Sequence, residues 1–328
     1  MESTKIVFAQ DKGPRENLED ALGAFSLSIP GPKALDVTVA VLADGVGGNK
    51  YGEVASAIAV GTIKSFLAAS LAALDEKAGG NTFTPDSILS LLRQSLIAAN
   101  NAVLAEIDRN PEYGGMSTTV VCGIIINGRI FVAWMGDSRC YVYRNGKIKQ
   151  ITHDHSEIQP LVDAGLTNED EARLHPLSHA INRFVGMRDG FTVDTAVCHL
   201  SHGDKIVFCS DGLTDVLSDR RIADLLHRYQ QGASSFRQLP QHLIQQALEA
   251  GTMDNVSVLC CEHLPDLTPE FEFFEFTLTG AYPVELAETL KHFRKERKNV
   301  QATRNAGRKD LSRPGKSSLA TKPDVPSL

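Results

Sequence analysis

Runs of apolar, β-branched residues recur along the chain up to residue 261, and most are bounded on at least one side by Gly, Asn, Asp or Ser, as strands are. Asn127-Gly128 separates two of these runs and Asn145-Gly146 follows a third. Both dipeptides readily take the positive φ angles of tight hairpin turns, so we expect neighbouring strands to be antiparallel. The predicted strands are Lys5–Gln10, Asp36–Leu42, Ser117–Ile126, Arg129–Met135, Arg139–Arg144, Phe191–Val197, Lys205–Cys209 and Val256–Cys261.

Longer segments between these runs carry apolar residues at intervals of three and four, which predicts amphipathic helices. They are Gly52–Leu74, Pro85–Ile107, Asp219–Tyr229 and Leu239–Ala250. Strands joined by hairpins and interrupted by paired helices do not fit a doubly wound parallel sheet. Helices laid over antiparallel sheets bury the apolar faces of both, so we predict an α+β sandwich over roughly residues 5–263.

The periodic pattern weakens after about Leu264. Phe271–Phe276 could add a short strand and Val284–Arg297 a helix, but the closing stretch KSSLATKPDVPSL is polar and interrupted by proline, which is typical of disorder. We therefore divide the chain into a core domain, residues 1–264, and a C-terminal extension, residues 265–328. We expect the extension to be partly disordered.

Charge is distributed unevenly along the 328 residues. Residues 291–328 hold eleven Lys or Arg and three acidic residues, a net charge of +8, whereas the whole chain carries −7, so residues 1–290 carry −15. We therefore expect a basic extension, with its positive charge in residues 291–328, and an acidic body. An acidic body argues against nucleic acid as the main substrate and suits a protein that gathers carboxylates around cations.

Targeting and redox features are sparse. No run reaches the roughly 18–20 apolar residues that span a bilayer, and the start MESTKIVFAQDKG lacks an apolar signal region. The six cysteines show no CxxC spacing, and most fall in apolar strand-like runs where free thiols pack as small hydrophobes. We expect a cytoplasmic protein without a transmembrane segment.

Four aspartates stand at the ends of predicted strands. Asp44, Asp137 and Asp211 each follow a strand and Asp254 precedes one, so antiparallel pairing can bring all four to the same rim of the sandwich. Clustered carboxylates raise one another's pKa unless a cation neutralises them. An all-oxygen ligand set selects Mg²⁺, Mn²⁺ or Ca²⁺, and a pair of such ions can activate a water and stabilise the charge on a phosphoryl group.

Seven motifs in the same order give the chain a specific resemblance. They are Gly13-Pro14-Arg15-Glu16-Asn17-Leu18-Glu19-Asp20, Ala43-Asp44-Gly45-Val46-Gly47-Gly48, Gly115-Met116-Ser117-Thr118-Thr119, Gly136-Asp137-Ser138-Arg139, Thr152-His153-Asp154-His155-Ser156, Ser210-Asp211-Gly212-Leu213-Thr214-Asp215 and Asp254-Asn255-Val256-Ser257. Together they resemble the PPM family of metal-dependent protein phosphatases, the type 2C serine/threonine phosphatases. This resemblance covers about residues 10–261.

The resemblance implies a four-layer α-β-β-α sandwich of two antiparallel sheets flanked by helices, with Mn²⁺ or Mg²⁺, two or three ions per chain, in a cleft at the sheet rim. Asp44 would bridge two ions, the carbonyl of Gly45 would bind one, and Asp211 with Asp254 would bind the other. Asp137 with Asp211 matches the family's weaker third site. Glu19 and Asp20 would act mostly through water.

Catalysis in such a protein would use a metal-activated water, with Asp44 and Asp211 as catalytic residues and Arg15 as the phosphate-binding arginine. A guanidinium fork matches two phosphate oxygens. Some family members carry His two residues after the first aspartate as general acid. Here that residue is Val46, so the leaving-group proton must come from water at the site or from another group.

The implied reaction is hydrolysis of phosphoserine and phosphothreonine in proteins, in a signalling enzyme acting on the targets of a serine/threonine kinase. We expect a monomer that does not bind nucleic acid. The segment Asp154–Gly186, called the flap below, matches a variable part of the family beside the cleft and is our candidate for substrate choice. Two alternatives remain open at this point: a catalytically inactive module that binds phosphoproteins, and a phosphohydrolase of small molecules.

Overall fold

A computed structural model describes residues 4–29, 35–46, 51–75, 83–230, 235–264 and 275–278. The chain divides into two units, Met1–Gly280 and Ala281–Leu328, and all described residues belong to the first. The helix predicted at Val284–Arg297 therefore lies outside the described residues. The predicted boundary at residue 264 stays a prediction.

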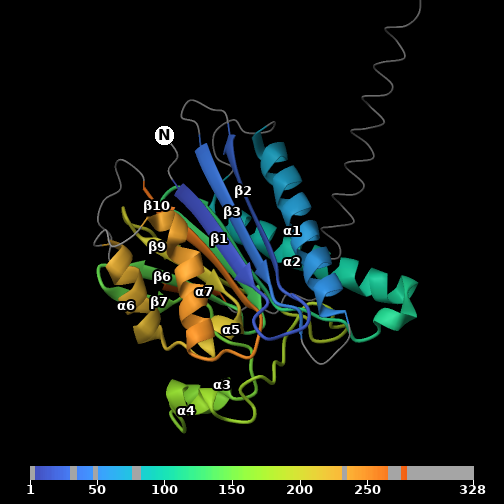
Figure 1. Cartoon of the computed structure of the whole chain (residues 1–328). Helices are drawn as coiled ribbons and strands as arrows, with labels where there is room; N and C mark the ends of the chain where they lie inside the picture. Colours follow the sequence, from blue (N-terminus) through green and yellow to red (C-terminus); the bar gives the residue numbers. More distant parts are fainter. Residues whose placement is uncertain are drawn as a thin grey trace, which may run out of the picture. The chain divides into compact units, whose positions relative to one another are not determined.

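Two antiparallel sheets form the centre of the first unit (Figure 1). One has the strand order β1-β10-β9-β6-β7 and the other the order β11-β8-β5-β4-β3-β2. The strands are β1 Thr4–Asp11, β2 Ala21–Ile29, β3 Leu35–Ala43, β4 Val120–Ile126, β5 Arg129–Met135, β6 Arg139–Arg144, β7 Lys147–Gln150, β8 Asp194–His199, β9 Lys205–Cys209, β10 Val256–His263 and β11 Glu275–Leu278.

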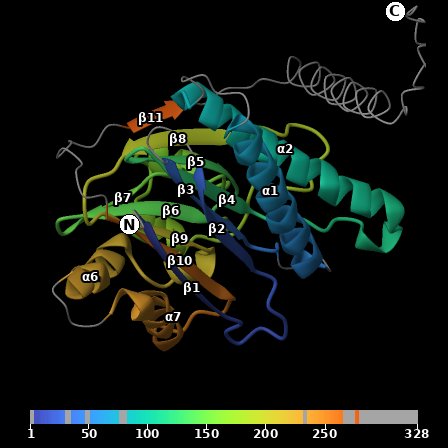
Figure 2. The same cartoon turned by 90° about the horizontal axis from the view of Figure 1, so that it is seen from above.

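Helices cover the outer face of each sheet (Figure 2). α1 (Gly52–Asp75) and α2 (Pro85–Arg109) pack on the six-stranded sheet, while α6 (Asp219–Gln230) and α7 (Leu239–Glu249) pack on the five-stranded sheet. The predicted four-layer α-β-β-α sandwich is confirmed. Shorter helices are α3 Gln159–Asp163, α4 Glu169–Arg173, α5 Asp211–Thr214 and the 3₁₀ turns Pro111–Tyr113 and Phe236–Gln238.

The core consists of three apolar layers that follow from the alternation of side chains along each strand. In β4, Val120 and Cys122 face the helices α1 and α2, whereas Val121 and Ile125 face the other sheet. A strand buried on both faces needs a continuous apolar run, and this explains why β4 reads VVCGIII. The six cysteines are free and buried, as expected.

Local signals in the sequence set the turns and one helix start. Asn127 and Gly128 have φ angles of 51° and 66°, and the hairpin at Asn145-Gly146 has 47° and 83°. The Thr84 side chain accepts a hydrogen bond from the Ser87 N–H at 3.2 Å and so caps α2, with proline at the first turn.

Some elements differ from their predictions. β2, β7 and the short helices α3, α4 and α5 were not predicted, and β4 and β8 begin three residues later than their apolar runs suggested. β2 reads ALGAFSLSI, in which Ala, Gly and Ser weaken the strand signal; pairing with β3 and packing against α1 stabilise it instead.

Two helices, α1 and α2, are long and apolar enough to cross a membrane by length and composition alone. Both contribute one face to the apolar layer on the six-stranded sheet, through residues such as Ile63, Leu67 and Leu92. Core helices of this length meet the same criterion. The expected absence of a transmembrane segment remains a prediction.

The distance between the two sheets depends on Gly123 in β4. A Cβ built on Gly123 would lie 2.6 Å from Cζ of Phe208, a ring in the other sheet. We predict that Gly123→Ala lowers the free energy of unfolding by about 1–3 kcal/mol because of overpacking. Gly61→Ala is the control, since nothing lies within 4 Å of its Cβ; it should raise that free energy by roughly 0.5–1 kcal/mol because alanine favours a helix. Urea titration measures both, and an unchanged midpoint for Gly123→Ala would contradict the prediction.

Candidate active site

The four predicted aspartates meet in one cleft at the rim of the sandwich. Asp44 follows β3, Asp137 follows β5 and Asp211 follows β9, while Asp254 precedes β10. Strands from both sheets therefore contribute to the cleft, which holds about 760 Å³ of open space. Its lining is Arg15, Asp44, Gly45, Val46, Thr119, Asp137, His179, Ile181, Asp211, Asp215, Met253 and Asp254.

Asp44 is held by two threonines from the segment before β4. The Asp44 N–H donates to Oγ1 of Thr119 at 3.1 Å, and Oγ1 of Thr118 donates to the Asp44 carbonyl at 2.7 Å. Thr119 Oγ1 also lies 2.7 Å from Oγ of Ser138, the residue after Asp137. One buried hydroxyl thus links the turns that carry Asp44 and Asp137.

Asp254 belongs to a turn fixed by its neighbour Asn255. Nδ2 of Asn255 donates to the carbonyls of Lys12 at 2.8 Å and Asn17 at 2.9 Å, and Oδ1 accepts from the Glu19 N–H at 2.7 Å. These three bonds hold the loop that carries Arg15 against the start of β10. The role of Asn255 could not be predicted from spacing, because its partners lie more than 230 residues away along the chain.

Asp211 is the first residue of α5, directly after β9. The N–H of Asp215 donates to the Asp211 carbonyl at 2.8 Å and closes the helical turn. Asp215 therefore lies at the C-terminal end of this short helix. His179 of the flap was also not predicted: its ring, Asp211 and Asp215 bring one ligand atom each within 4.8 Å of the others.

Crowding makes these carboxyl groups hard to ionise together. Burial is the largest cause of a raised pKa for Asp44, followed by the charges of Asp20 and Asp211. Burial and then Asp211 raise the pKa of Asp137 well above its ordinary value. Burial and Asp211 also raise the pKa of Asp215 to about 8. A positive charge at the centre of the cluster would lower these pKa values and let the carboxyl groups ionise together.

The donor set fits a divalent cation. Among the described residues, Oδ1 of Asp20 and Oδ1 of Asp211 are buried without a hydrogen-bond partner, which is unusual for carboxylate oxygens. The ligands predicted from the sequence are all oxygen atoms, the type that Mg²⁺ and Mn²⁺ prefer. A bound cation would partner these oxygens and offset the repulsion between the carboxylates.

Glu19 and Asp20 lie behind the cleft lining. Oδ2 of Asp20 accepts from Oγ of Ser210 at 3.0 Å, and the Asp20 carboxyl is close enough to raise the pKa of Asp44. The Glu19 carbonyl accepts from Oγ of Ser56 at 2.6 Å and from the Gly45 N–H at 3.2 Å. Gly47 and Gly48 of the same motif lie outside the described residues.

Arg15 lines the cleft and pairs with one of the candidate ligands. Its Nη2 donates to Oδ2 of Asp254 at 2.6 Å, and its Nε donates to the Met253 carbonyl at 3.1 Å. The Arg15 side chain is 45% exposed and the Asp254 side chain 33%. An ion pair this exposed to water contributes about 0–1 kcal/mol, so another anion can displace Asp254 at small cost.

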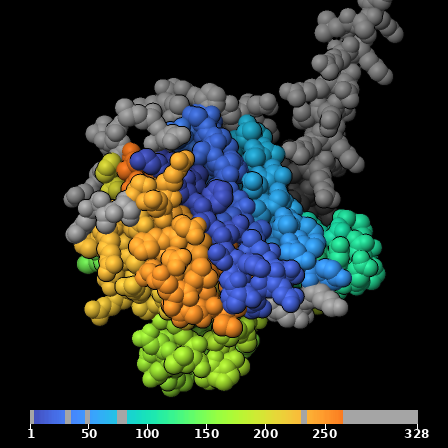
Figure 3. All heavy atoms as spheres, viewed as in Figure 1, coloured from blue at the N-terminus to red at the C-terminus, as the bar shows by residue number. Residues whose placement is uncertain are grey.

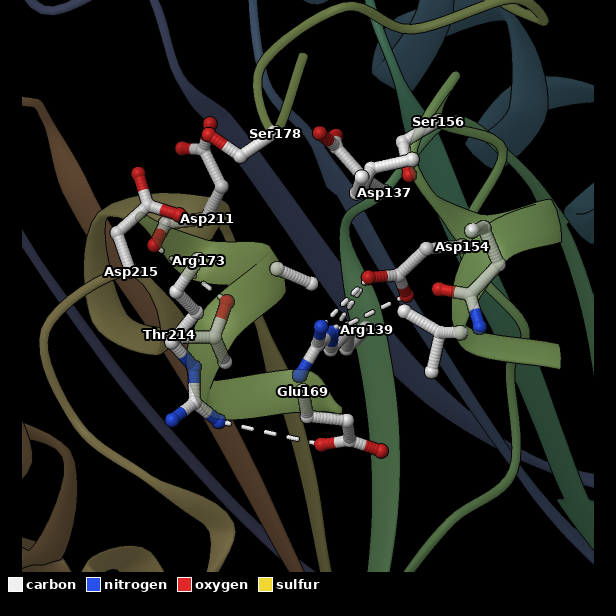
Figure 4. Close-up of a pocket in the computed structure, with 14 residues that line it drawn as sticks. Asp137, Arg139, Asp154, Ser156, Glu169, Arg173, Ser178, Asp211, Thr214 and Asp215 are labelled. Atoms are coloured by element: carbon white, nitrogen blue, oxygen red, sulfur yellow. Dashed lines mark hydrogen bonds and ion pairs between the residues drawn. The ribbon is translucent and has the colours of Figure 1, made fainter. Parts of the chain in front are cut away.

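A second pocket continues the cleft beneath the flap (Figure 4). Asp137, Asp211 and Asp215 line both, and α3 and α4 close the pocket from the other side. Figure 4 shows Arg139 facing Asp154, with which it forms a forked ion pair at 2.6–3.0 Å. The ion pair between Arg139 and Asp154 therefore joins the start of the flap to the segment that follows Asp137.

Comparison with known proteins identifies the family. The family model described as protein phosphatase 2C matches residues 19–250. The serine/threonine protein phosphatase PstP of Mycobacterium tuberculosis is 34% identical over 223 residues, which cover 67% of this chain. The chain belongs to the protein phosphatase 2C family. The family prediction made from the motifs is therefore confirmed.

Other members of the phosphatase 2C family match over more of their length. The serine/threonine phosphatase stp of Listeria welshimeri is 29% identical over 256 residues, 78% of this chain and 94% of that protein. A crystal structure of the PstP catalytic domain in complex with two manganese ions has a TM-score of 0.61 and 30% identity, and covers 80% of this chain and 99% of that one.

These relatives favour the serine/threonine phosphatase prediction over both alternatives. The match with full-length PstP, however, spans only 39% of that protein. The activity of full-length PstP therefore does not by itself establish the activity of this protein.

The repulsion among the carboxylates has a measurable consequence for stability. At pH 8 in chelator, we predict that Asp44→Asn unfolds at a higher temperature than the unmodified protein, by about 2–4 °C per kcal/mol of repulsion removed. Asp44→Asn should also lose most of the rise in unfolding temperature that added Mn²⁺ causes in the unmodified protein. Asp108→Asn, at an exposed ion pair, is the control. Differential scanning fluorimetry measures both effects, and a lower unfolding temperature for Asp44→Asn in chelator would contradict the first.

Proposed function

We propose that this protein is a metal-dependent phosphatase that hydrolyses phosphoserine and phosphothreonine in other proteins. The carrying observation is the convergence of four aspartates with Arg15 in one cleft, in a chain of the phosphatase 2C family. Carboxylates suit divalent cations and the guanidinium suits a phosphate dianion. The acidic body of the domain supports a phosphoprotein substrate over a nucleic acid.

In this proposal Asp44 would hold both of two ions, the Gly45 carbonyl would contribute to one, and Asp211 with Asp254 would hold the other. Asp137 with Asp211 would serve a third, weaker site, and Glu19 and Asp20 would act through water. The ions, when bound, supply an activated water and positive charge opposite the phosphoryl group. Mn²⁺ and Mg²⁺ both fit the donor set, and the two manganese ions of the PstP structure favour manganese.

Arg15 binds the phosphate in this proposal. Its exposed pair with Asp254 is weak enough for a phosphate dianion to replace, and a forked hydrogen bond to two phosphate oxygens is stronger than the bond it gives up. The carboxylates of the cleft repel a phosphate dianion. The Arg15 guanidinium partly offsets their negative charge. The Val46 side chain has no acidic proton, so the leaving group must take its proton from water or from another residue of the cleft.

We also infer the biological setting. The substrates are the targets of a serine/threonine kinase, and the protein acts as a cytoplasmic signalling enzyme and as a monomer. The catalytic domain is residues 1–264, followed by the basic extension, residues 265–328. Support for this setting is the sequence pattern and the naming of the relatives as protein phosphatases.

Hydrolysis of a phosphothreonine peptide tests the activity directly. We expect phosphate release with Mn²⁺ or Mg²⁺, none with chelator, and a fall of roughly 10²-fold or more in kcat for Asp211→Asn, since one essential charge is lost. Asp108→Asn, in an exposed ion pair with Arg188, is the matched control. Absence of metal-dependent release would refute the enzyme, whereas release from phosphotyrosine alone would refute only the substrate class.

The flap offers a surface for choosing among protein substrates, as a lobe beside the cleft (Figure 3). Leu166 is 74% exposed and Leu174 is 88% exposed, and two further leucines of the flap are also exposed. Around them stand five exposed acidic residues: Glu157, Asp163, Glu169, Asp170 and Glu171. We infer that the flap binds substrate segments that combine an apolar residue with Lys or Arg.

Peptides that differ beside the phosphothreonine test this preference. The unmodified protein should show a KM roughly tenfold lower for a peptide flanked by Leu and Arg than for one flanked by Ala, because two leucines lose exposed area on binding. The double variant Leu166→Ser with Leu174→Ser should lose that preference. Phe8→Ser, an exposed apolar residue on β1, should retain it. A preference unchanged in the double variant would contradict the inference.

A further inference from the structure

Asp137 is held by its preceding residue, Gly136, which has left the β4–β5 ladder. The ladder ends at the pair Val120 and Met135, so the buried N–H of Gly136 needs another acceptor. Gly136 also has a φ angle of 107°, and a Cβ there would lie 2.5 Å from Cβ of Thr119. This conformation aims the chain toward the cleft and needs external support.

His155 supplies that support through both polar backbone groups of Gly136. The Gly136 N–H donates to Nδ1 of His155 at 3.1 Å, and the His155 N–H donates to the Gly136 carbonyl at 3.1 Å. The His155 ring is buried, with 4% of the side chain exposed, and stacks on Trp134 with 6.1 Å between ring centroids. The ring therefore has little room to turn away from Gly136.

The hydrogen-bond pattern fixes the tautomer of His155. Because Nδ1 accepts from Gly136, the ring proton of neutral His155 must lie on Nε2, which is 3.1 Å from Oδ2 of Asp194 at the start of β8. Burial alone would raise the pKa of Asp194, but the hydrogen bond from His155 and the charge of Arg183 outweigh it and lower that pKa. Asp194 is therefore a carboxylate that accepts from both residues.

Arg183 brings the other end of the flap to the same carboxylate. Its Nη1 donates to Oδ1 of Asp194 at 3.1 Å. The N–H of Asn182 donates to the His155 carbonyl at 2.9 Å, and Ser156 forms an isolated antiparallel β-bridge with Ile181. Both ends of the flap are thus fastened at His155, and the same residue also holds Gly136 in the turn before Asp137.

We propose that His155 is a positioning residue that sets Asp137 in the cleft and fastens both ends of the flap to the Asp137 turn. A displacement of the flap would then be felt at Asp137, which lines both the cleft and the pocket beneath the flap. The role of Asp137 in catalysis rests on the function proposed above. The physical link between His155, Gly136 and Asp194 does not.

Two substitutions separate the two bonds of the ring. Asn places its side-chain oxygen near the position of Nδ1, so His155→Asn can keep the acceptor for Gly136 while losing the donor to Asp194. Gln places its nitrogen near Nε2, so His155→Gln can keep the donor to Asp194 while losing the acceptor for Gly136. His153→Asn is the matched control, since His153 is half exposed and pairs with Asp163.

Amide hydrogen exchange of the full chain without added metal gives a readout independent of activity. The Gly136 amide should exchange roughly tenfold faster in His155→Gln, because a buried N–H loses its acceptor. It should exchange faster by a smaller factor in His155→Asn, which keeps the acceptor but loosens the flap, and at close to the unmodified rate in His153→Asn. The amides near Asn182 should instead exchange faster in His155→Asn. Equal Gly136 exchange in the Asn and Gln variants would overturn the proposal.

Steady-state kinetics then tests the consequence for Asp137. We expect the kcat of His155→Gln to be about tenfold lower than that of the unmodified protein, with KM changed by less than about twofold. The kcat of His155→Asn should lie much closer to that of the unmodified protein. The exchange pattern without this fall in kcat would overturn the positioning role. A chain with the expected exchange but no phosphatase activity in any form would refute the proposed function and leave the link to Gly136 supported.

A further variant, at Arg183, tests the same link if both His155 variants fail to fold. Arg183→Gln removes the charge that fastens one end of the flap to Asp194 and leaves the His155 ring in place. Faster amide exchange at both Asn182 and Gly136 would support the coupling of flap and turn. Faster exchange at Asn182 with an unchanged Gly136 amide would overturn it.

Discussion

The mutual repulsion of buried carboxylates is the constraint on which the rest of the site depends. Burial, and after it the charge of neighbouring carboxylates, raises the pKa of Asp44, Asp137 and Asp211, so ionising all three is costly without a compensating positive charge. Such a cluster persists only because the surrounding fold over-determines the position of each member. The sandwich provides this rigidity, because each aspartate directly adjoins a strand whose side chains are packed in one of the three apolar layers.

The cleft is formed by both sheets. Asp44 and Asp137 follow strands of the six-stranded sheet, whereas Asp211 and Asp254 adjoin strands of the other. Their separation is therefore governed by how closely the sheets pack, and contacts such as Gly123 with Phe208 set that distance. A side-chain change in the middle of the sandwich can alter the cleft without touching any polar residue in it.

Much of the fold and the central cluster could be predicted because the signals are local. β-branched runs, Asn-Gly turns and strand-end aspartates identify the paired sheets and the rim where the carboxylates gather. The contributions of Thr119, His155 and Asn255 could not be predicted from spacing, since their partners come from distant segments. β2 was missed for a related reason: its Ala, Gly and Ser have weak strand propensity, and tertiary pairing decides its conformation.

The pairing of β1 with β10 has a consequence for how the protein acquires its cleft. Thr4 pairs with His263, and Asn255 closes the loop of Arg15, so residues from the two ends of the domain must meet before the cleft exists. During synthesis β1 therefore has no partner strand in its sheet until β10 has been made. Contacts of such long sequence separation form slowly, and the assembled cleft is therefore among the last features to appear as the chain folds.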